Sequence, residues 1–232
     1  AQPQGTFTRK KVANGDTVVA QSTPYGYGGI GVVRVTGPSA VKILGRLSGM
    51  SKNKLRVVKP RKAYKRTILD ENNKPFDDVV VTLYKEPKSY TGEDVLELHG
   101  HGGPVLVSEV LQSILKAGAR PAAPGEFSER AFLNGRLDLA QAEAIADLIN
   151  SATATAARSA MRSLKGEFSE QINAFSVILA DLRAYIEAAI DFPEEEIDFL
   201  TEGDVEARVC SASQWLSDLK EGASQGALLA NG

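Results

Sequence analysis

Residues 138–193 carry one apolar stripe at helical spacing, and this feature limits the fold more than any other in the chain. Its members recur at steps of three or four residues: Ile145, Ile149, Ala152, Ala156, Ala160, Leu164, Phe168, Ile172, Phe175, Leu179, Leu182 and Ile186. Because that spacing returns to one face of an α-helix, it predicts a long amphipathic helix, which begins at a D-x-x-Q capping signature, Asp138 and Gln141. One unbroken helix over 139–192 would be about 80 Å long. We therefore expect either a single very long helix or a break near "INSATATA" or Gly166.

A second helix is predicted from about Gly203 to Glu221. It carries Trp215 and the one cysteine of the chain, Cys210, among apolar neighbours. A lone cysteine excludes a disulfide framework and favours a reducing compartment, and a thiol in this setting is expected to be buried. Two long helices with broad apolar stripes are marginally stable alone. This all-α part is therefore expected to be incomplete and to pack against another segment or another subunit.

The first part of the chain is predicted to be mixed α and β. Runs rich in Val and Ile, together with amphipathic spacing, are the basis of that prediction. The predicted strands are 16–21, 30–36, 64–69, 77–84 and 94–100, and the predicted helices are 37–47 and 105–118. The turn "ENNKP" joins the third and fourth strands as a hairpin. These patterns give a leader of residues 1–15, an α+β domain over 16–124 and a helical domain over 125–232.

Charge is unevenly divided between these parts. Residues 1–124 carry 19 Lys and Arg against 10 Asp and Glu, whereas 125–232 carry 8 against 19. The stretch from Val32 to Leu69 has eleven basic residues and no acidic one. Such a stretch is typical either of a solvated surface or of a surface that attracts phosphates. The second interpretation assigns a role in holding RNA to four of its residues: Lys59, Arg61, Lys62 and Lys65.

The segment "GYGGIG", residues 26–31, has the glycine spacing of a dinucleotide-binding loop. That loop requires a helix directly after its last glycine and an acidic residue about 20 positions later. Here Gly31 is followed by the strand-like "VVRV", and no acidic residue occurs between Asp16 and Asp70. No G-x-x-x-x-G-K-[ST] sequence is present either. The glycines are therefore interpreted as a strand-loop-strand connection that positions Arg34 on the second strand.

Other candidate sites are weak. His99 and His101 in "HGHGG" lack the further ligands that a metal needs, so no metal site is assigned. Glu194 to Glu196 are interpreted as an exposed acidic helix start rather than a cation site. No catalytic triad or acid–base pair is defensible, and catalytic residues stay unassigned. No apolar run approaches the ~20 residues that span a bilayer, and "AQPQGTFTRKK" has no secretory h-region, so no membrane contact is expected.

Four segments together resemble one known family. They are "DTVVAQSTPYGYGGIGVVRVTGP", "SYTGEDVLELHGHGGP", "PGEFSERAFLNGRLDLAQAEAIADLI" and "YIEAAIDFPEEEIDFL". In this order they resemble the MnmE (TrmE) family of tRNA-modifying GTPases, from about Asp16 to Gly232. The resemblance implies an α+β domain similar to the tetrahydrofolate-binding domains of aminomethyltransferases, followed by the first half of a helical domain. It also implies an N-terminal portion that lacks the family's GTPase domain, to which GTP, magnesium and potassium are expected to bind.

The resemblance implies a folate site at three residues. The family's basic residue after the glycine loop matches Arg34, its acidic residue in "DVLEL" matches Glu97, and its basic residue before "LDLAQAEA" matches Arg136. A carboxylate such as Glu97 can accept hydrogen bonds from the N–H edge of a pterin, and a guanidinium can hold the tail carboxylates of folate. Ordinary ion pairs are the structural alternative for each residue. Tyr27 stands where the family usually has Arg, so the contacts of the loop itself are not carried over.

The function that the resemblance implies is modification of C5 of wobble uridine 34 in tRNA, with a one-carbon unit from 5-formyl- or 5,10-methylene-tetrahydrofolate. The implied partners are tRNA, a second copy of the chain bound through the N-terminal domain, and an FAD-dependent flavoprotein of the MnmG type. The implied location is the bacterial cytoplasm, with an organelle as the alternative. A folate-free scaffold for dimerisation and partner docking is the alternative function. Aminomethyltransferase-like catalysis by this domain alone is a third interpretation.

Overall fold

The chain forms two compact units that meet in sequence at Leu137 and Asp138. Their coordinates come from a computed structural model, which describes residues 15–70, 72–191 and 205–231. We call them the sheet unit, Ala1–Leu137, and the helical unit, Asp138–Gly232. The sequence instead predicts the division between residues 124 and 125. The segment 125–137 carries the helix Glu126–Leu133, and Arg130 on this helix donates hydrogen bonds to Asp16 in the first part of the sheet unit.

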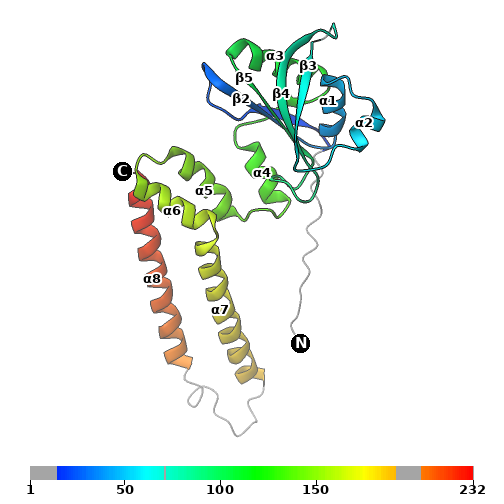
Figure 1. Ribbon diagram of the computed structural model, residues 1–232. Helices are drawn as coiled ribbons and strands as arrows, with labels where there is room; N and C mark the ends of the chain where they lie inside the picture. Colours follow the sequence, from blue (N-terminus) through cyan, green and yellow to red (C-terminus); the bar gives the residue numbers. More distant parts are fainter. Residues whose placement is uncertain (1–14, 71, 192–204, 232) are drawn as a thin grey trace. The chain divides into compact units, whose positions relative to one another are not determined.

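A six-stranded sheet is the framework of the sheet unit (Figure 1). Its strands are β1 (Val18–Gln21), β2 (Gly28–Thr36), β3 (Ala63–Leu69), β4 (Pro75–Tyr84), β5 (Val95–Gly102) and β6 (Arg120–Pro121). They lie in the order β3-β4-β5-β2-β1-β6, and every neighbouring pair is antiparallel except β1 with β6. The sheet therefore places β5 directly beside β2, which is far from it in sequence.

The helices α1 (Ala40–Leu47) and α3 (Pro104–Lys116) pack against one face of this sheet. The sheet unit also contains the helices α2 (Lys52–Arg56) and α4 (Glu126–Leu133). The core between the sheet, α1 and α3 includes Val33, Val35, Ile43, Leu96, Leu98 and Ile114, each at most 2% exposed. Because successive side chains of a strand point to opposite faces, Arg34 and Glu97 lie on the face away from this core.

The fold class expected from the sequence, an α+β part followed by an all-α part, is confirmed. All five predicted strands and both predicted helices of the first part are present, with ends that differ by a few residues. Gly118, with φ of +105°, follows the end of α3 as a helix-terminating glycine does. The elements α2 and β6 are not predicted, because five and two residues are too few for a periodic pattern. The helix α4 is not predicted either.

The helical unit breaks its long apolar stripe at both of the expected places. Its helices are α5 (Leu139–Asn150), α6 (Ala154–Leu164), α7 (Glu167–Asp191) and α8 (Val205–Asn231). Asp138 and Gln141 form the predicted capping box at the start of α5. Thr153 caps α6, and Gly166 takes a φ of +93° between α6 and α7. A positive φ is strained for residues other than glycine. Gly166 therefore allows α6 to end and α7 to begin with only two residues between them.

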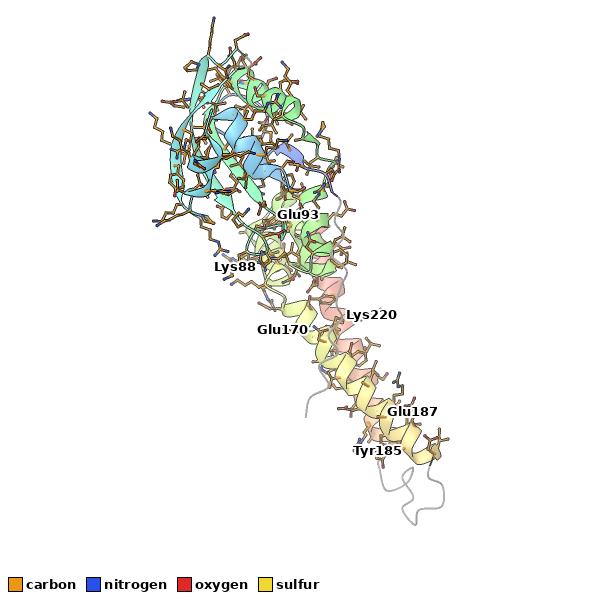
Figure 2. All side chains as sticks on the ribbon, turned by 90° about the vertical axis from the view of Figure 1, so that its right-hand side faces the viewer. Lys88, Glu93, Glu170, Tyr185, Glu187 and Lys220 are labelled. Atoms are coloured by element: carbon orange, nitrogen blue, oxygen red, sulfur yellow. The ribbon has the colours of Figure 1, made fainter. Side chains whose placement is uncertain are left out.

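The helices α7 and α8 run antiparallel and side by side (Figure 1). The rings of Phe175 and Trp215 stack with their centres 5.1 Å apart, and the guanidinium carbon of Arg208 lies 4.8 Å from the ring centre of Tyr185. Figure 2 labels Tyr185 near the far end of α7.

The prediction that Cys210 is buried is wrong, because its side chain is exposed. Ala212 on the same helix is buried, and a residue two positions away points about 200° from it around a helix. Cys210 therefore faces away from the seam between α7 and α8.

Two further expectations concern the outer parts of the chain. The acidic run Glu194 to Glu196 and all but the last residue of the leader 1–15 lie outside the described residues. Among the helices that the structure describes, none is long and apolar enough to cross a bilayer.

Candidate ligand-binding site

Arg34 on β2 and Glu97 on β5 form the centre of a polar site on the sheet face away from α1 and α3. They are directly opposite each other in the β2–β5 ladder. Nη2 and Nε of Arg34 lie 2.8 Å and 2.9 Å from Oε1 of Glu97. The side chains remain 29% and 15% exposed, respectively, so a ligand can reach the pair. The sheet thus brings together two of the three residues that the family resemblance implies.

Two aromatic rings flank this ion pair. The guanidinium carbon of Arg34 lies 5.5 Å from the ring centre of Tyr90 and 5.9 Å from that of Phe127. Both distances fall within the range of cation–π attraction. The hydroxyls of Tyr90 and Ser128 are hydrogen-bonded at 2.9 Å, which ties the loop after β4 to α4. The rings therefore form an apolar wall beside a guanidinium and a carboxylate.

The second oxygen of Glu97 has polar neighbours of its own. The Tyr84 hydroxyl donates to Oε2 at 3.4 Å, and Nε2 of His99 lies 3.4 Å from the same oxygen. Burial and the adjacent charge of Glu97 raise the pKa of Tyr84, so its hydroxyl remains a donor at neutral pH. The site can thus accept hydrogen bonds through Glu97, donate them through Arg34, and hold a flat ring against aromatic side chains.

Arg136, the third implied residue, is exposed and lies on the loop that follows α4. The aliphatic stem of Arg136 packs against the backbone of Gly92. A Cβ atom added to Gly92 would lie 3.2 Å from Cγ of Arg136. Gly92 belongs to the same loop as Tyr90, which contacts Arg34. Among the described residues, the Arg136 guanidinium has no carboxylate partner, and no hydrogen bond joins it to the Arg34–Glu97 pair. Its charge is available to a ligand.

A buried charge network holds the loop and α4 in place, and the sequence reasoning missed it. Arg130 is 3% exposed and its guanidinium bonds to three carboxylates: Asp16 at 2.8 Å, Glu93 at 3.1 Å and Glu126 at 2.8 Å. Arg120 joins two of the same carboxylates, with a 2.6 Å contact to Glu126. Glu93 is labelled in Figure 2. The i, i+4 spacing of Glu126 and Arg130 was the signal that could have revealed part of this network.

The network lowers the pKa values of two of its carboxylates, Glu126 and Asp16. The hydrogen bonds from Arg120, helped by the Ala123 amide and Arg130, lower the pKa of Glu126 to about 2. Hydrogen bonds from the same two arginines lower the pKa of Asp16. Glu126 and Asp16 are therefore charged at neutral pH, and the buried charge of Glu126 is compensated by its arginine partners.

The glycine loop packs closely against the end of β5. Gly28 pairs with Gly102. A Cβ atom added to Gly102 would lie only 2.5 Å from the carbonyl oxygen of Gly28. The strand β2 continues through Gly31 without a helix, so the segment is not a dinucleotide-binding loop, as the sequence indicated. Tyr25 and Tyr27 are 90% and 95% exposed on this loop.

The two histidines of "HGHGG" have separate environments. His99 lies beside Glu97, whereas Nδ1 of His101 is 2.5 Å from Oδ1 of the buried Asp77. The backbone N–H of His101 also donates to Asp77. Within the part of the chain that the structure describes, no group of three or more His, Cys, Asp and Glu residues is arranged to hold a metal ion.

Comparisons with known proteins agree with the family resemblance. Residues 17–136 match the family model described as the N-terminus of the GTP-binding protein TrmE, and residues 139–232 match the MnmE helical domain. The tRNA modification GTPases MnmE of Coxiella burnetii (strain Dugway 5J108-111) and Pseudomonas paraeruginosa are 51% and 52% identical to this chain. Both matches cover 94% of this chain and 46% of the relative. The chain thus spans about half the length of the curated relatives it matches.

Proposed function

Because the chain belongs to the MnmE (TrmE) family and has its N-terminal and helical domains, we propose that it binds a reduced folate as part of a tRNA modification GTPase. The protein would place a one-carbon-derived group on C5 of wobble uridine 34 of tRNA. The folate, 5-formyl- or 5,10-methylene-tetrahydrofolate, would supply that carbon. GTP hydrolysis, with magnesium and potassium, is assigned to no residue of this chain.

The observation that carries the proposal is the Arg34–Glu97 pair beside Tyr90 and Phe127. A pterin is a flat ring with an N–H edge and a carbonyl oxygen. The Glu97 carboxylate can accept hydrogen bonds from the N–H edge, and the Arg34 guanidinium can donate to the carbonyl oxygen. The rings of Tyr90 and Phe127 can pack against the face of the pterin. The donor set therefore fits a pterin.

The direct contact between Arg34 and Glu97 refines the roles that the resemblance suggested. Because Arg34 and Glu97 lie 2.8 Å apart, both would contact the same end of a ligand. Arg34 is thus better suited to the pterin end together with Glu97 than to the tail carboxylates at the other end of folate. Arg136, exposed and without a carboxylate partner among the described residues, is the candidate for the tail.

We further propose that the protein forms a homodimer through the sheet unit and works with tRNA and an FAD-dependent flavoprotein of the MnmG type in the bacterial cytoplasm. The exposed Tyr25 and Tyr27 of the glycine loop support a contact surface there, because large exposed aromatic side chains are enriched at protein interfaces. The same observation supports the alternative, a folate-free dimerisation scaffold.

Calorimetry with 5-formyltetrahydrofolate tests the folate site. We expect Glu97→Gln and Arg34→Ala each to weaken binding at least tenfold, because each removes a charged hydrogen-bonding partner worth about 1.5–3 kcal/mol. Lys65→Ala is the matched control, since Lys65 forms an exposed cross-strand ion pair with Asp78 on β3 and β4. Unchanged affinity in both site variants would defeat the proposal.

The scaffold alternative makes a different prediction for the unmodified chain. Light scattering after size-exclusion chromatography would detect a dimer in either case. A dimeric chain without detectable folate binding would favour the scaffold, whereas folate binding by the dimer favours the proposed function.

A further inference from the structure

A pocket lies on the helical face of the sheet, away from the Arg34–Glu97 pair. It is bounded by α1, α2 and the end of β4, and its volume is about 910 Å³. The helices α1 and α2 can be followed side by side in Figure 1. Leu83 lines the pocket from the core face of β4, opposite the face to which Glu97 points. We call this cavity the α1–α2 pocket.

The floor of the α1–α2 pocket is apolar. Val41, Met50 and Leu55 contribute to it from α1, the connecting loop and α2. The two helices approach closely at Gly45, where a Cβ atom would lie 2.5 Å from Leu55 Cδ1. An apolar floor of this size matches the sites that hold the flat or aliphatic part of a ligand.

The charged residues that line the same pocket are all basic. Five cations line it and no acidic residue does: Lys42, Arg46, Lys52, Arg56 and Lys85. Lys85 is paired with Asp94, and Arg46 donates to the carbonyl of Lys116. The other three are exposed, and none forms an ion pair or side-chain hydrogen bond within the described residues. Three uncompensated positive charges therefore border an apolar cavity.

The surrounding charge distinguishes among anionic ligands. Further exposed cations follow in the same segment of the chain at Lys54, Lys59 and Lys62, and residues 32–69 contain no acidic residue. Several cations in and next to the segments that line the pocket fit a chain of phosphates better than a single small anion. Lys65 is less suited to that role, because Asp78 already neutralises it at 2.8 Å.

We propose that the α1–α2 pocket binds single-stranded RNA, with Lys42, Lys52 and Arg56 on its phosphates and one base on the apolar floor. Unpaired nucleotides expose both a charged backbone and a flat ring, which are the two features that this pocket complements. The choice of RNA over DNA rests on the proposed function. The location differs from the sequence-based assignment, which centred on residues 59–65.

Fluorescence anisotropy of a labelled twelve-nucleotide oligouridylate with the full chain tests this proposal. The variant Lys42→Gln/Lys52→Gln/Arg56→Gln should lose at least tenfold in affinity at 100 mM KCl. Its slope of log K against log salt concentration should fall by about 2, at ~0.7 for each lost phosphate contact with a single strand. The matched control is Lys74→Gln/Lys88→Gln/Lys165→Gln, which removes three exposed charges outside the pocket and should bind nearly as well as the unmodified chain.

Three results would overturn the proposal. The first is an equal loss in both triple variants, which would indicate a general charge effect. The second is equally effective competition by inorganic polyphosphate of the same charge, which would remove the role of the base. The third is binding to anionic phosphatidylglycerol vesicles without binding to the oligonucleotide, which would indicate a membrane surface. Folate binding should be unchanged in the pocket variant, so the failure of one site is distinguishable from the failure of the other.

Discussion

Replacing Arg130 by Met should destabilise the sheet unit more than any change to a surface ion pair. The substitution keeps much of the side-chain volume and removes the charge that three carboxylates share, those of Asp16, Glu93 and Glu126. Arg130 is 3% exposed, so solvent cannot replace its contacts. Removing one partner of a buried ion pair costs about 3–5 kcal/mol, because the remaining charge stays buried without compensation.

The lowered pKa of Glu126 gives a second measure of how much the charge network contributes to the free energy of unfolding. This pKa falls from an ordinary 4.5 to about 2. Each unit corresponds to about 1.36 kcal/mol, so the depression represents roughly 3 kcal/mol of stability from the whole network, of which Arg120 supplies the largest share. Because Arg120 keeps its share of this stabilisation in the variant, we expect Arg130→Met to lose about 3 kcal/mol at pH 7, the lower end of the range for a broken buried ion pair.

The loss should depend on pH in a defined direction. A carboxylate whose pKa is lowered by folding contributes its full stabilisation above its unfolded pKa, and loses it as the pH falls through the folded value. For Glu126 that window runs from about pH 5 down to about pH 2. The deficit of Arg130→Met should therefore be full at pH 7 and smaller at pH 3, where protonation removes the uncompensated charges.

Hydrogen exchange of β5 peptides, followed across a urea series, measures this deficit in the sheet unit. The single tryptophan, Trp215, lies on α8, so its fluorescence reports on the helical unit instead. Lys65→Met is the control, because its ion pair with Asp78 is exposed and should contribute little to stability. A deficit for Arg130→Met no larger than that of the control, or one that does not change between pH 7 and pH 3, would refute the reasoning.

Three further changes test other parts of the structure. Gly102→Ala would bring a Cβ atom against the backbone of Gly28 and should cost about 1–3 kcal/mol, measured as a lower midpoint of urea unfolding. Asp138→Ala removes the cap of α5 and should cost about 1 kcal/mol, measured by hydrogen exchange of α5 peptides, whereas an unchanged rate would contradict the capping role. Phe175→Leu removes the stacking partner of Trp215 and should cost about 1 kcal/mol with a shift of its fluorescence emission; an unaltered spectrum would count against the stacked pair.

The parts of the fold with a clear period were predictable from the sequence. The Val- and Ile-rich run 30–36 identified β2, and the alternation of Glu97 with Leu96 and Leu98 identified β5, because a strand buried on one face repeats every two residues. The three-and-four spacing of residues 139–191 identified helix, whereas the breaks were predicted from "INSATATA" and Gly166, because the cap at Thr153 and Gly166 interrupt the chain without interrupting the apolar pattern.

The helix α4 was missed because its buried face is charged. Glu126 and Arg130 are 5% and 3% exposed, and a hydrophobic pattern assigns such residues to the surface. Their burial is stable only because compensating charges come from Asp16 and Glu93, which are distant in sequence, and from Arg120, which lies outside the helix. Such compensation depends on tertiary structure, and a local pattern does not contain it.

The candidate site shows the same limit. The resemblance identified Arg34, Glu97 and Arg136 one at a time, and it left open which of the two guanidinium groups holds which end of a ligand. The strand order puts β5 beside β2, which brings Arg34 and Glu97 into contact. Register across strands distant in sequence decides this distance, and no single-sequence pattern specifies it.

The buried network and the candidate site are joined through α4, and this link gives a last prediction. Arg130 fixes the helix that carries Phe127 beside Arg34, whereas the Arg34–Glu97 pair is fixed by the sheet. Arg130→Met should therefore weaken folate binding about fivefold at a temperature where the variant is folded, the equivalent of about 1 kcal/mol for one aromatic contact.

Calorimetry at 10 °C, beside the Phe127→Leu variant, tests this link. Both substitutions should reduce affinity by a similar factor, and the double variant should lose little more than either alone, since both act through the same ring. Additive losses would show that Arg130 affects the site by another route. Full affinity in Phe127→Leu would exclude that ring from the wall of the site.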